Sequence, residues 1–145
     1  MMLYTNRFLL AFKRSRVLEN DPFFQTHLEL VNLIHRLTYG KNPLTLVESL
    51  VTHFIFHFIE EDQLMRVIGY PQRSQHSKEH DSIKEQIVIM APRLLSGNIL
   101  EEEIDLFKDR VIHHIQTHDQ HFIRYLDNYH KPLLDNLLNE HHSTD

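Results

Sequence analysis

The sequence has 145 residues, no cysteine, and a formal net charge of −5 at pH 7. A chain of this length forms one ordinary domain that buries a core without disulfides, and the lack of cysteine excludes disulfide bonds, thiolate metal sites and iron–sulfur clusters. The negative charge is spread along the chain without a basic stripe, which argues against a nucleic-acid partner.

The amino-terminal segment contains one short apolar run, from Phe8 to Phe12. This run is too short for the hydrophobic part of a signal peptide and far too short to cross a bilayer. We therefore expect a cytoplasmic protein with no membrane association. Residues 1–20 are predicted to form an arm packed across the rest of the domain.

Proline and glycine divide the rest of the chain into segments with helical apolar spacing. Asp21 and Asn42 are candidate N-caps, each followed by a proline, and further breaks fall at residues 68–72 and 91–98. The four predicted helices span roughly residues 21–39, 43–67, 73–91 and 99–129.

The predicted fold class is all-α. No segment alternates like a half-buried strand, and only three glycines are present. Short connections between long helices favour antiparallel neighbours, so we expect an up-down-up-down four-helix bundle with the amino-terminal arm. The tail, residues 130–145, is predicted to add a short helix after Pro132, so that residues 1–145 form a single domain.

Polar residues interrupt the apolar face of the second predicted helix. The stretch HFIFHFIEEDQLM, residues 53–65, places His53, His57 and Glu61 one turn apart on that face. Polar groups that point into a core need a partner that offsets their desolvation, and a metal ion is one such partner.

The other predicted helices also bring histidines or carboxylates to their apolar faces. The chain has 13 histidines, so one HxxxH pair is expected by chance roughly once in this length. Each group alone has a simpler explanation, such as a core histidine or a surface ion pair. Because a bundle has a single core, four helices that each supply such groups together favour a metal site. The further candidates are His27, His76, His80, His114, His118 and Asp119.

These segments resemble the hemerythrin family, including its single-domain bacterial members. The resemblance rests on His27, HFIEEDQLM (57–65), YPQRSQHSKEH (70–80) and HIQTHD (114–119). It implies a non-heme centre of two iron ions joined by an oxo or hydroxo bridge. The implied ligands are His76, His80 and His114 on one iron, His27 and His57 on the other, and Glu61 and Asp119 as bridges.

The donor types agree with this resemblance. Ferritin-like di-iron bundles use Glu-x-x-His, which occurs nowhere in the sequence. Five neutral imidazoles with only two carboxylates favour iron(II), and therefore reversible oxygen binding over oxidative chemistry. The resemblance also implies a position on the two-histidine iron where dioxygen binds. Its apolar surroundings would be Leu30, Phe58, Val111 and Ile115, which offer no acid or base for turnover.

The function expected from the resemblance is that of an oxygen carrier, store or sensor, and not of an enzyme. Three alternatives stay open. The centre could be a redox enzyme that acts on oxygen, peroxide or nitric oxide, including weak oxidase or peroxidase activity. It could serve a regulator read by a protein partner in trans. The bundle could also hold zinc or no metal. We expect a monomer or a small homo-oligomer.

Several positions depart from the family pattern or remain open. Asp119 is five positions after His114, and on a regular helix this spacing turns the two side chains about 140° apart. His118, at the i+4 position, is therefore a rival ligand. A bridging geometry or a π-bulge would be needed to turn Asp119 inward. His53 is expected either beside a ligand or in simple packing. The residues that differ from those usual in the family are Phe24, Thr26, Arg110 and Phe122. The histidines expected at the core boundary are His35, His113, His121 and His130.

Overall fold

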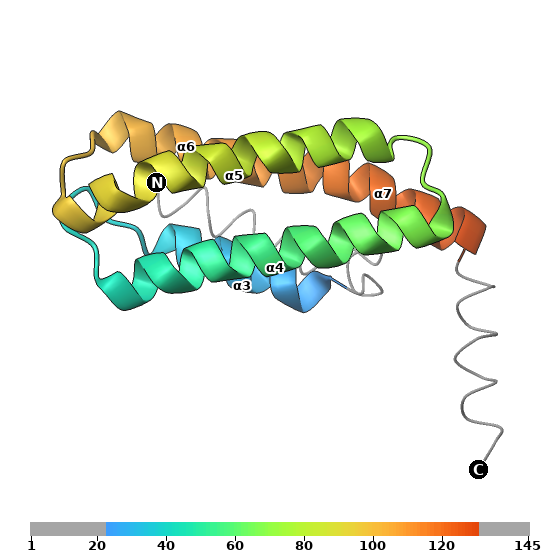
Figure 1. The fold of residues 1–145 in the computed structure, drawn as a ribbon, viewed down its shortest axis with the longest axis horizontal. Helices are drawn as coiled ribbons and strands as arrows, with labels where there is room; N and C mark the ends of the chain where they lie inside the picture. Colours follow the sequence, from blue (N-terminus) through green and yellow to red (C-terminus); the bar gives the residue numbers. More distant parts are fainter. Residues whose placement is uncertain (1–22, 131–145) are drawn as a thin grey trace, which may run out of the picture.

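The computed structural model describes residues 23–130, and the predicted arm and carboxy-terminal helix lie outside the described residues. Helix α3 (Phe24–His35), α4 (Leu44–Ile68) and α5 (Arg73–Ser96) form three rods of a bundle (Figure 1). The fourth rod is continuous and contains α6 (Glu101–His114), the π-helix η1 (Ile115–Asp119), α7 (Gln120–Tyr125) and the π-helix η2 (Leu126–His130).

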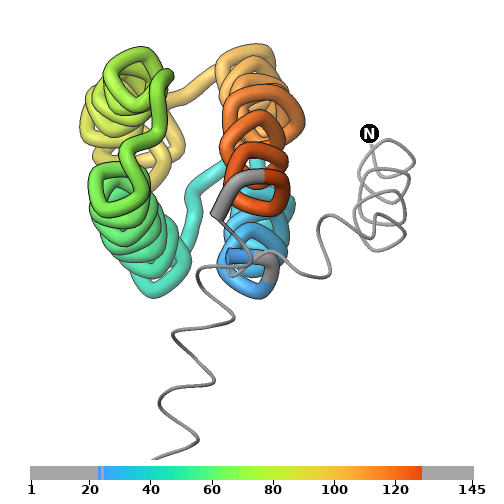
Figure 2. The backbone as a smooth tube through the Cα atoms, turned by 90° about the vertical axis from the view of Figure 1, so that its right-hand side faces the viewer, coloured from blue at the N-terminus to red at the C-terminus, as the bar shows by residue number. Residues whose placement is uncertain are grey.

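The four rods run antiparallel to their neighbours and, seen end-on in Figure 2, occupy the corners of a square. Packing contacts join α3 to α4, α4 to α5, and α3 to α6. The predicted all-α, antiparallel four-helix bundle is confirmed. Across residues 23–130, no helix is both long enough and apolar enough to span a membrane.

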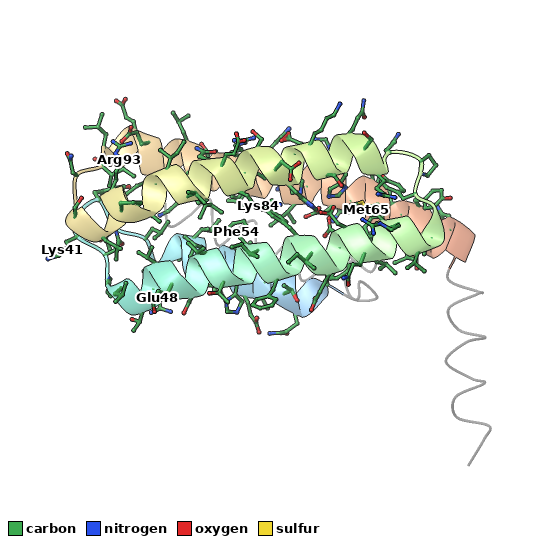
Figure 3. All side chains as sticks on the ribbon, viewed as in Figure 1. Lys41, Glu48, Phe54, Met65, Lys84 and Arg93 are labelled. Carbon is green, nitrogen blue, oxygen red and sulfur yellow. The ribbon has the colours of Figure 1, made fainter. Side chains whose placement is uncertain are left out.

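The core consists of two separate apolar clusters. The larger cluster fills most of the bundle length and includes the fully buried Leu50 and Phe54, the latter labelled in Figure 3. The smaller cluster lies near the α4–α5 turn and consists of Phe23, Met65, Tyr70 and Phe122. These side chains are at most 7% exposed. The helices are therefore held together by apolar packing at both ends of the bundle.

Asn42 was predicted to cap the second helix, and this prediction is wrong. The N-cap residue of α4 is Pro43, without a side-chain hydrogen bond. Asn42 is instead buried, where its side chain accepts a hydrogen bond from the Thr38 amide (2.8 Å) and donates to the carbonyl of Leu94 (3.2 Å). It fastens the α3–α4 loop to the end of α5, because a buried loop must satisfy its backbone groups.

Helix α5 continues past the position where it was predicted to end. Pro92 lies inside the helix, which runs on to Ser96, and the buried Leu94 continues the apolar face. Proline removes one backbone donor, but here it does not end the helix. The helix ends at Gly97, whose φ of 78° lies in the left-handed region that favours glycine.

Two glycines with left-handed backbone conformation allow a matched stability test. Gly69 ends α4 at φ 69°, and a Cβ added there meets nothing within 4 Å, whereas a Cβ at Gly97 would lie 3.1 Å from the Lys41 backbone nitrogen. We expect Gly69→Ala to lower the free energy of unfolding by about 1 kcal/mol from backbone strain alone, and Gly97→Ala to lower it further. Urea unfolding of both variants measures the difference. Equal losses would contradict the role of the Lys41 contact.

Candidate metal centre

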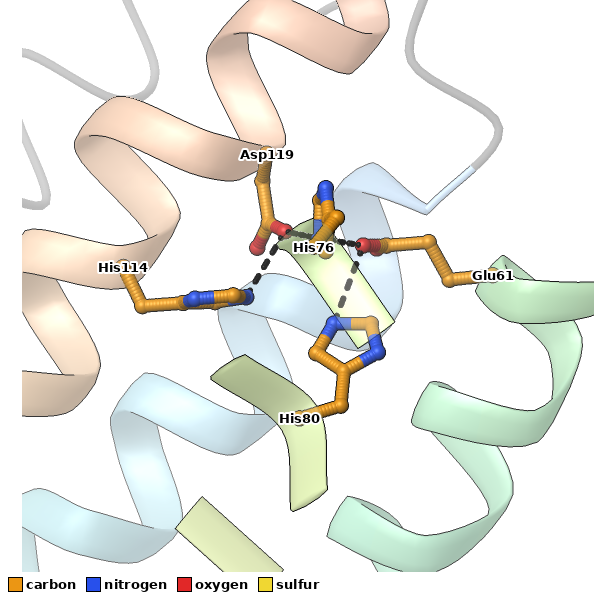
Figure 4. Close-up of side chains that lie close together, drawn as sticks. All are labelled: Glu61, His76, His80, His114 and Asp119. Carbon is orange, nitrogen blue, oxygen red and sulfur yellow. Dashed lines mark ion pairs between the residues drawn. The ribbon is translucent and has the colours of Figure 1, made fainter. Parts of the chain in front are cut away.

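The seven residues that the sequence suggested as metal ligands meet inside the bundle. They form two groups in which the donor atoms lie within 4.8 Å of one another. The two carboxylates belong to both groups. One group contains Glu61, His76, His80, His114 and Asp119, drawn in Figure 4, and the other contains His27, His57, Glu61 and Asp119.

Helical spacing explains how four of these side chains reach the centre. His57 and Glu61 are four residues apart on α4, and His76 and His80 are four residues apart on α5. Residues at this spacing lie one above the other on the same helix face. His27 enters from α3. All seven side chains are buried, with residue exposures between 0 and 4%.

A π-helix brings Asp119 into the cluster. The segment Ile115–Asp119 has π geometry, while His114 is the last residue of α6. The wider turn compensates for the five-residue separation of His114 and Asp119, which on a regular helix would point apart. Asp119 is 1% exposed. The predicted local widening of the helix is confirmed.

His118, the rival to Asp119, lies at the edge of the cluster. Its side chain is 35% exposed and its Nε2 is 3.7 Å from a Glu79 carboxylate oxygen. Its ring stacks on the ring of His114, with centroids 5.3 Å apart. The structure therefore brings Asp119, and not His118, among the buried donor atoms.

The two oxygens of each carboxylate face different histidine groups. Glu61 directs Oε1 to the Nε2 atoms of His76 and His80, the latter at 3.3 Å, and Oε2 to those of His57 (3.2 Å) and His27 (3.5 Å). Asp119 follows the same rule.

The Oδ1 atom of Asp119 lies 2.9 Å from His76 Nε2 and 3.1 Å from His114 Nε2, while the Oδ2 atom of Asp119 lies 3.1 Å from His27 Nε2. Glu61 and Asp119 are thus arranged as bridges between a group of three imidazoles and a group of two.

Without metal, these groups perturb one another strongly. Burial raises the pKa of the Glu61 carboxyl, but the surrounding imidazoles of His57 and His27 outweigh burial and hold that pKa well below its usual range. Burial lowers the pKa of His76, but its contacts with Asp119 and Glu61 raise it to about 10. Without metal, the carboxylates are therefore ionised and imidazole protons such as that on His76 balance their charge, and a metal ion would take the place of those protons.

The pKa of the Asp119 carboxyl is also held well below its usual range. Burial and the nearby negative charge of Glu61 raise it, and the imidazoles of His114 and His27 lower it by more. Two ionised carboxylates thus lie side by side in the interior, which is costly unless positive charge compensates them.

The hydrogen bonding of the cluster fits a metal site. Several buried donor atoms are close to one another but, among the described residues, form no hydrogen bond of acceptable geometry. These atoms are both carboxylate oxygens of Glu61 and of Asp119, Nε2 of His76, His80 and His114, and Nδ1 of His57, His76 and His114. Buried polar groups normally have a partner. Imidazole and carboxylate donors suit iron, zinc, copper, nickel or manganese.

The four predicted pocket residues, Leu30, Phe58, Val111 and Ile115, are 1–2% exposed and belong to the larger apolar cluster. Phe58 stacks on the ring of His80, with centroids 4.0 Å apart. This contact places an apolar face directly beside the histidine cluster. Whether the four residues surround a ligand remains a prediction.

His53 and Arg110 make their polar contacts away from the cluster. His53 contacts the Ser49 carbonyl (2.7 Å) and a Glu29 carboxylate oxygen (3.4 Å), so in the described chain it joins α4 to α3. Arg110 hydrogen-bonds Ser82 (2.6 Å) and Gln86 (2.7 Å) on α5. Arg110 therefore reinforces the packing of α6 against α5.

The histidines predicted at the core boundary lie at or near the protein surface where the structure describes them. His113 and His121 are exposed, and His35 is half-buried. The side chain of His130 lies outside the described part of the structure. Phe122 is fully buried and packs edge-on against Tyr70, with ring centroids 5.1 Å apart. It fills the smaller apolar cluster beside His76.

One polar residue beside the cluster was not predicted. Asp62 lies next to Glu61 in sequence, and its Oδ1 accepts hydrogen bonds from His80 Nδ1 (3.1 Å) and Ser77 Oγ (3.0 Å). This contact depends on how α4 pairs with α5. Spacing along one helix could not have revealed it.

Comparison with known proteins identifies relatives of the chain. No protein-family model matches it, and no solved structure is significantly similar. Bacteriohemerythrin from Campylobacter jejuni subsp. jejuni serotype O:23/36 (strain 81-176) is 27% identical over 121 residues, which cover 76% of this chain and 90% of the relative. Bacteriohemerythrin from Stenotrophomonas maltophilia (strain R551-3) is 23% identical over 107 residues, or 69% of this chain and 70% of the relative. Similarity over most of the chain, together with the buried cluster of histidines and carboxylates, makes this protein a homologue of the bacteriohemerythrins with a candidate metal site.

Proposed function

We propose that the protein binds dioxygen reversibly at a di-iron centre. The observation that carries this proposal is the division of carboxylate oxygens: Glu61 and Asp119 each turn one oxygen to each histidine group. Two carboxylates shared in this way are suited to holding two ions side by side. The proposed ligands are His76, His80 and His114 for one iron, His27 and His57 for the other, and both carboxylates as bridges.

The two histidine groups differ in the number of donors that they offer. One group supplies three imidazoles and the other supplies two. An ion in the second group therefore has one protein ligand fewer, which leaves room for a small ligand. Two iron(II) ions at this centre would supply the redox chemistry that dioxygen binding requires.

The apolar surroundings favour binding over turnover. Leu30, Phe58, Val111 and Ile115 are buried and carry no group that could donate or accept a proton. Their packing also keeps bulk water from the cluster, which limits loss of the bound ligand by side reactions. The bacteriohemerythrin relatives support the same reading. The protein would then act as an oxygen carrier, store or sensor.

Anaerobic iron reconstitution of the full chain tests this proposal. We expect two irons per chain by elemental analysis and, on exposure to air, a coloured adduct that disappears when oxygen is removed and returns when it is restored. Repeated consumption of oxygen, peroxide or nitric oxide would instead indicate a redox enzyme. A chain that takes up zinc but not iron would overturn the proposal.

Substitution of His118 tests which residue completes the cluster. Because His118 lies at the partly exposed edge, we expect His118→Ala to hold as many irons per chain as the wild type and with unchanged affinity. Elemental analysis after a fixed exposure to chelator measures this. Loss of an iron in this variant would show that His118 is a ligand and that the role proposed for Asp119 is wrong.

A further inference from the structure

Asp62 on α4 makes polar contacts with two residues of α5. Its Oδ1 lies 3.1 Å from His80 Nδ1 and 3.0 Å from Ser77 Oγ, and its side chain is 27% exposed. Ser77 and His80 are three residues apart, so both face α4. The serine hydroxyl donates to the same oxygen that accepts from His80, which fixes the orientation of the carboxylate.

This contact determines which nitrogen of His80 is free to bind a metal. An aspartate is ionised at neutral pH and accepts hydrogen bonds only, so Nδ1 of His80 must carry the proton. The lone pair is then on Nε2, which lies 3.3 Å from Glu61 Oε1 inside the cluster. A metal ligand held by a carboxylate on its other nitrogen has a fixed tautomer and is a stronger donor.

The ring of His80 is also held from its face. Phe58 stacks on it at a centroid distance of 4.0 Å with planes only 13° apart. Stacking restricts the tilt of the ring, while Asp62 restricts its rotation. The two contacts together leave His80 Nε2 directed at the cluster.

Three other imidazoles of the cluster lack such support in the described structure. Nδ1 of His57, His76 and His114 is buried without a hydrogen-bond partner among residues 23–130. Among these four histidines, a carboxylate contact on Nδ1 is therefore present at His80 and, in the part of the chain that the structure describes, is lacking at the other three.

We propose that Asp62 is a positioning residue for the candidate metal centre: it holds His80 in the tautomer and orientation that bind metal, and its negative charge strengthens that bond. The inference rests on the proposed metal centre but not on its reaction with oxygen. Cobalt(II) is therefore a suitable probe, because its absorption spectrum reports ligand geometry without any reaction with dioxygen being required.

The experiment measures cobalt(II) affinity of the full chain by competition with a chelator. We expect Asp62→Ala to weaken binding about 10- to 100-fold and to alter the cobalt spectrum. Asp62→Asn keeps an acceptor but loses the charge, so its loss of affinity should be smaller. Ser77→Ala, which removes only the support of Asp62, should show the smallest loss.

Asp81→Asn is the matched control. Asp81 follows His80 directly, its side chain is 69% exposed, and it pairs with Lys84 at 3.1 Å. The same change of charge next to the same ligand should leave cobalt affinity unchanged, because the carboxylate does not contact the imidazole. Urea unfolding of the metal-free variants separates metal positioning from a purely structural α4–α5 contact, which would lower stability but not affinity.

The outcomes are distinct. Asp62→Ala that binds cobalt as tightly as the wild type, or a wild-type chain that binds no cobalt, overturns this inference. A different pair of results is also informative: cobalt affinity depends on Asp62, but the iron-loaded chain gives no reversible oxygen adduct. This pair supports the inference and overturns only the proposed oxygen binding.

Discussion

A Glu61→Ala variant is expected to lose both irons together. Glu61 is 0% exposed and supplies an oxygen to each histidine group, so its removal takes a donor from both sites at once. His80→Ala affects directly only the group of three imidazoles and should retain part of the metal. Elemental analysis of the two variants after anaerobic reconstitution gives the comparison, with close to zero irons per chain expected for Glu61→Ala.

The neighbouring Glu60→Ala is the control for this substitution. Glu60 lies on the same helix but is exposed, so its loss should leave two irons per chain. Asp119→Ala should behave like Glu61→Ala, because Asp119 is shared in the same way. If Glu61→Ala kept one tightly bound iron, the carboxylate would belong to a single site and the bridging arrangement would be wrong.

Removal of the metal is expected to destabilise the protein markedly. Metal that binds only the folded chain, at a free concentration a hundred times its Kd, stabilises it by about 2.7 kcal/mol, which raises the unfolding temperature of a chain of this size by about 5–10 °C. Without metal, the ionised Glu61 and Asp119 are compensated by protonated imidazole such as that of His76, whereas metal ions would bind both carboxylates directly. Thermal unfolding of the iron-loaded and metal-depleted protein measures the shift.

The same experiment on Glu61→Ala provides the internal control. If the stabilisation comes from metal held by the cluster, chelator should not change the unfolding temperature of this variant. A wild-type protein whose unfolding temperature is the same with and without metal would show that the buried donors are satisfied within the protein alone.

Much of the candidate site could be predicted because it depends on helix periodicity. The pairs on α4 and α5 each have a spacing of four residues, so their common direction followed from the sequence. Asp119 was the harder case, because a regular helix turns it away from His114. Its inward position required local widening of the helix, which the structure shows as the π-helix.

The features that sequence reasoning missed depend on contacts between helices. Asn42 has the sequence of a helix cap, but its side chain is used to tie a loop to α5. Pro92 looked like a helix end, but the apolar face continues past it to Leu94. Asp62 gained its role from the register of α4 against α5. Local propensity is only a weak guide where tertiary packing decides.

The cluster of histidines and carboxylates lies between the two apolar clusters described above, so the bundle has no continuous hydrophobic core along its length. The smaller cluster, around Met65 and Tyr70, therefore depends on the polar layer for its attachment to the rest of the bundle. When that layer lacks its ions, this end should open first, and its backbone amides should exchange with deuterium sooner than those around Leu50. Loss of metal would thus show itself as fraying from one end and not as uniform loosening.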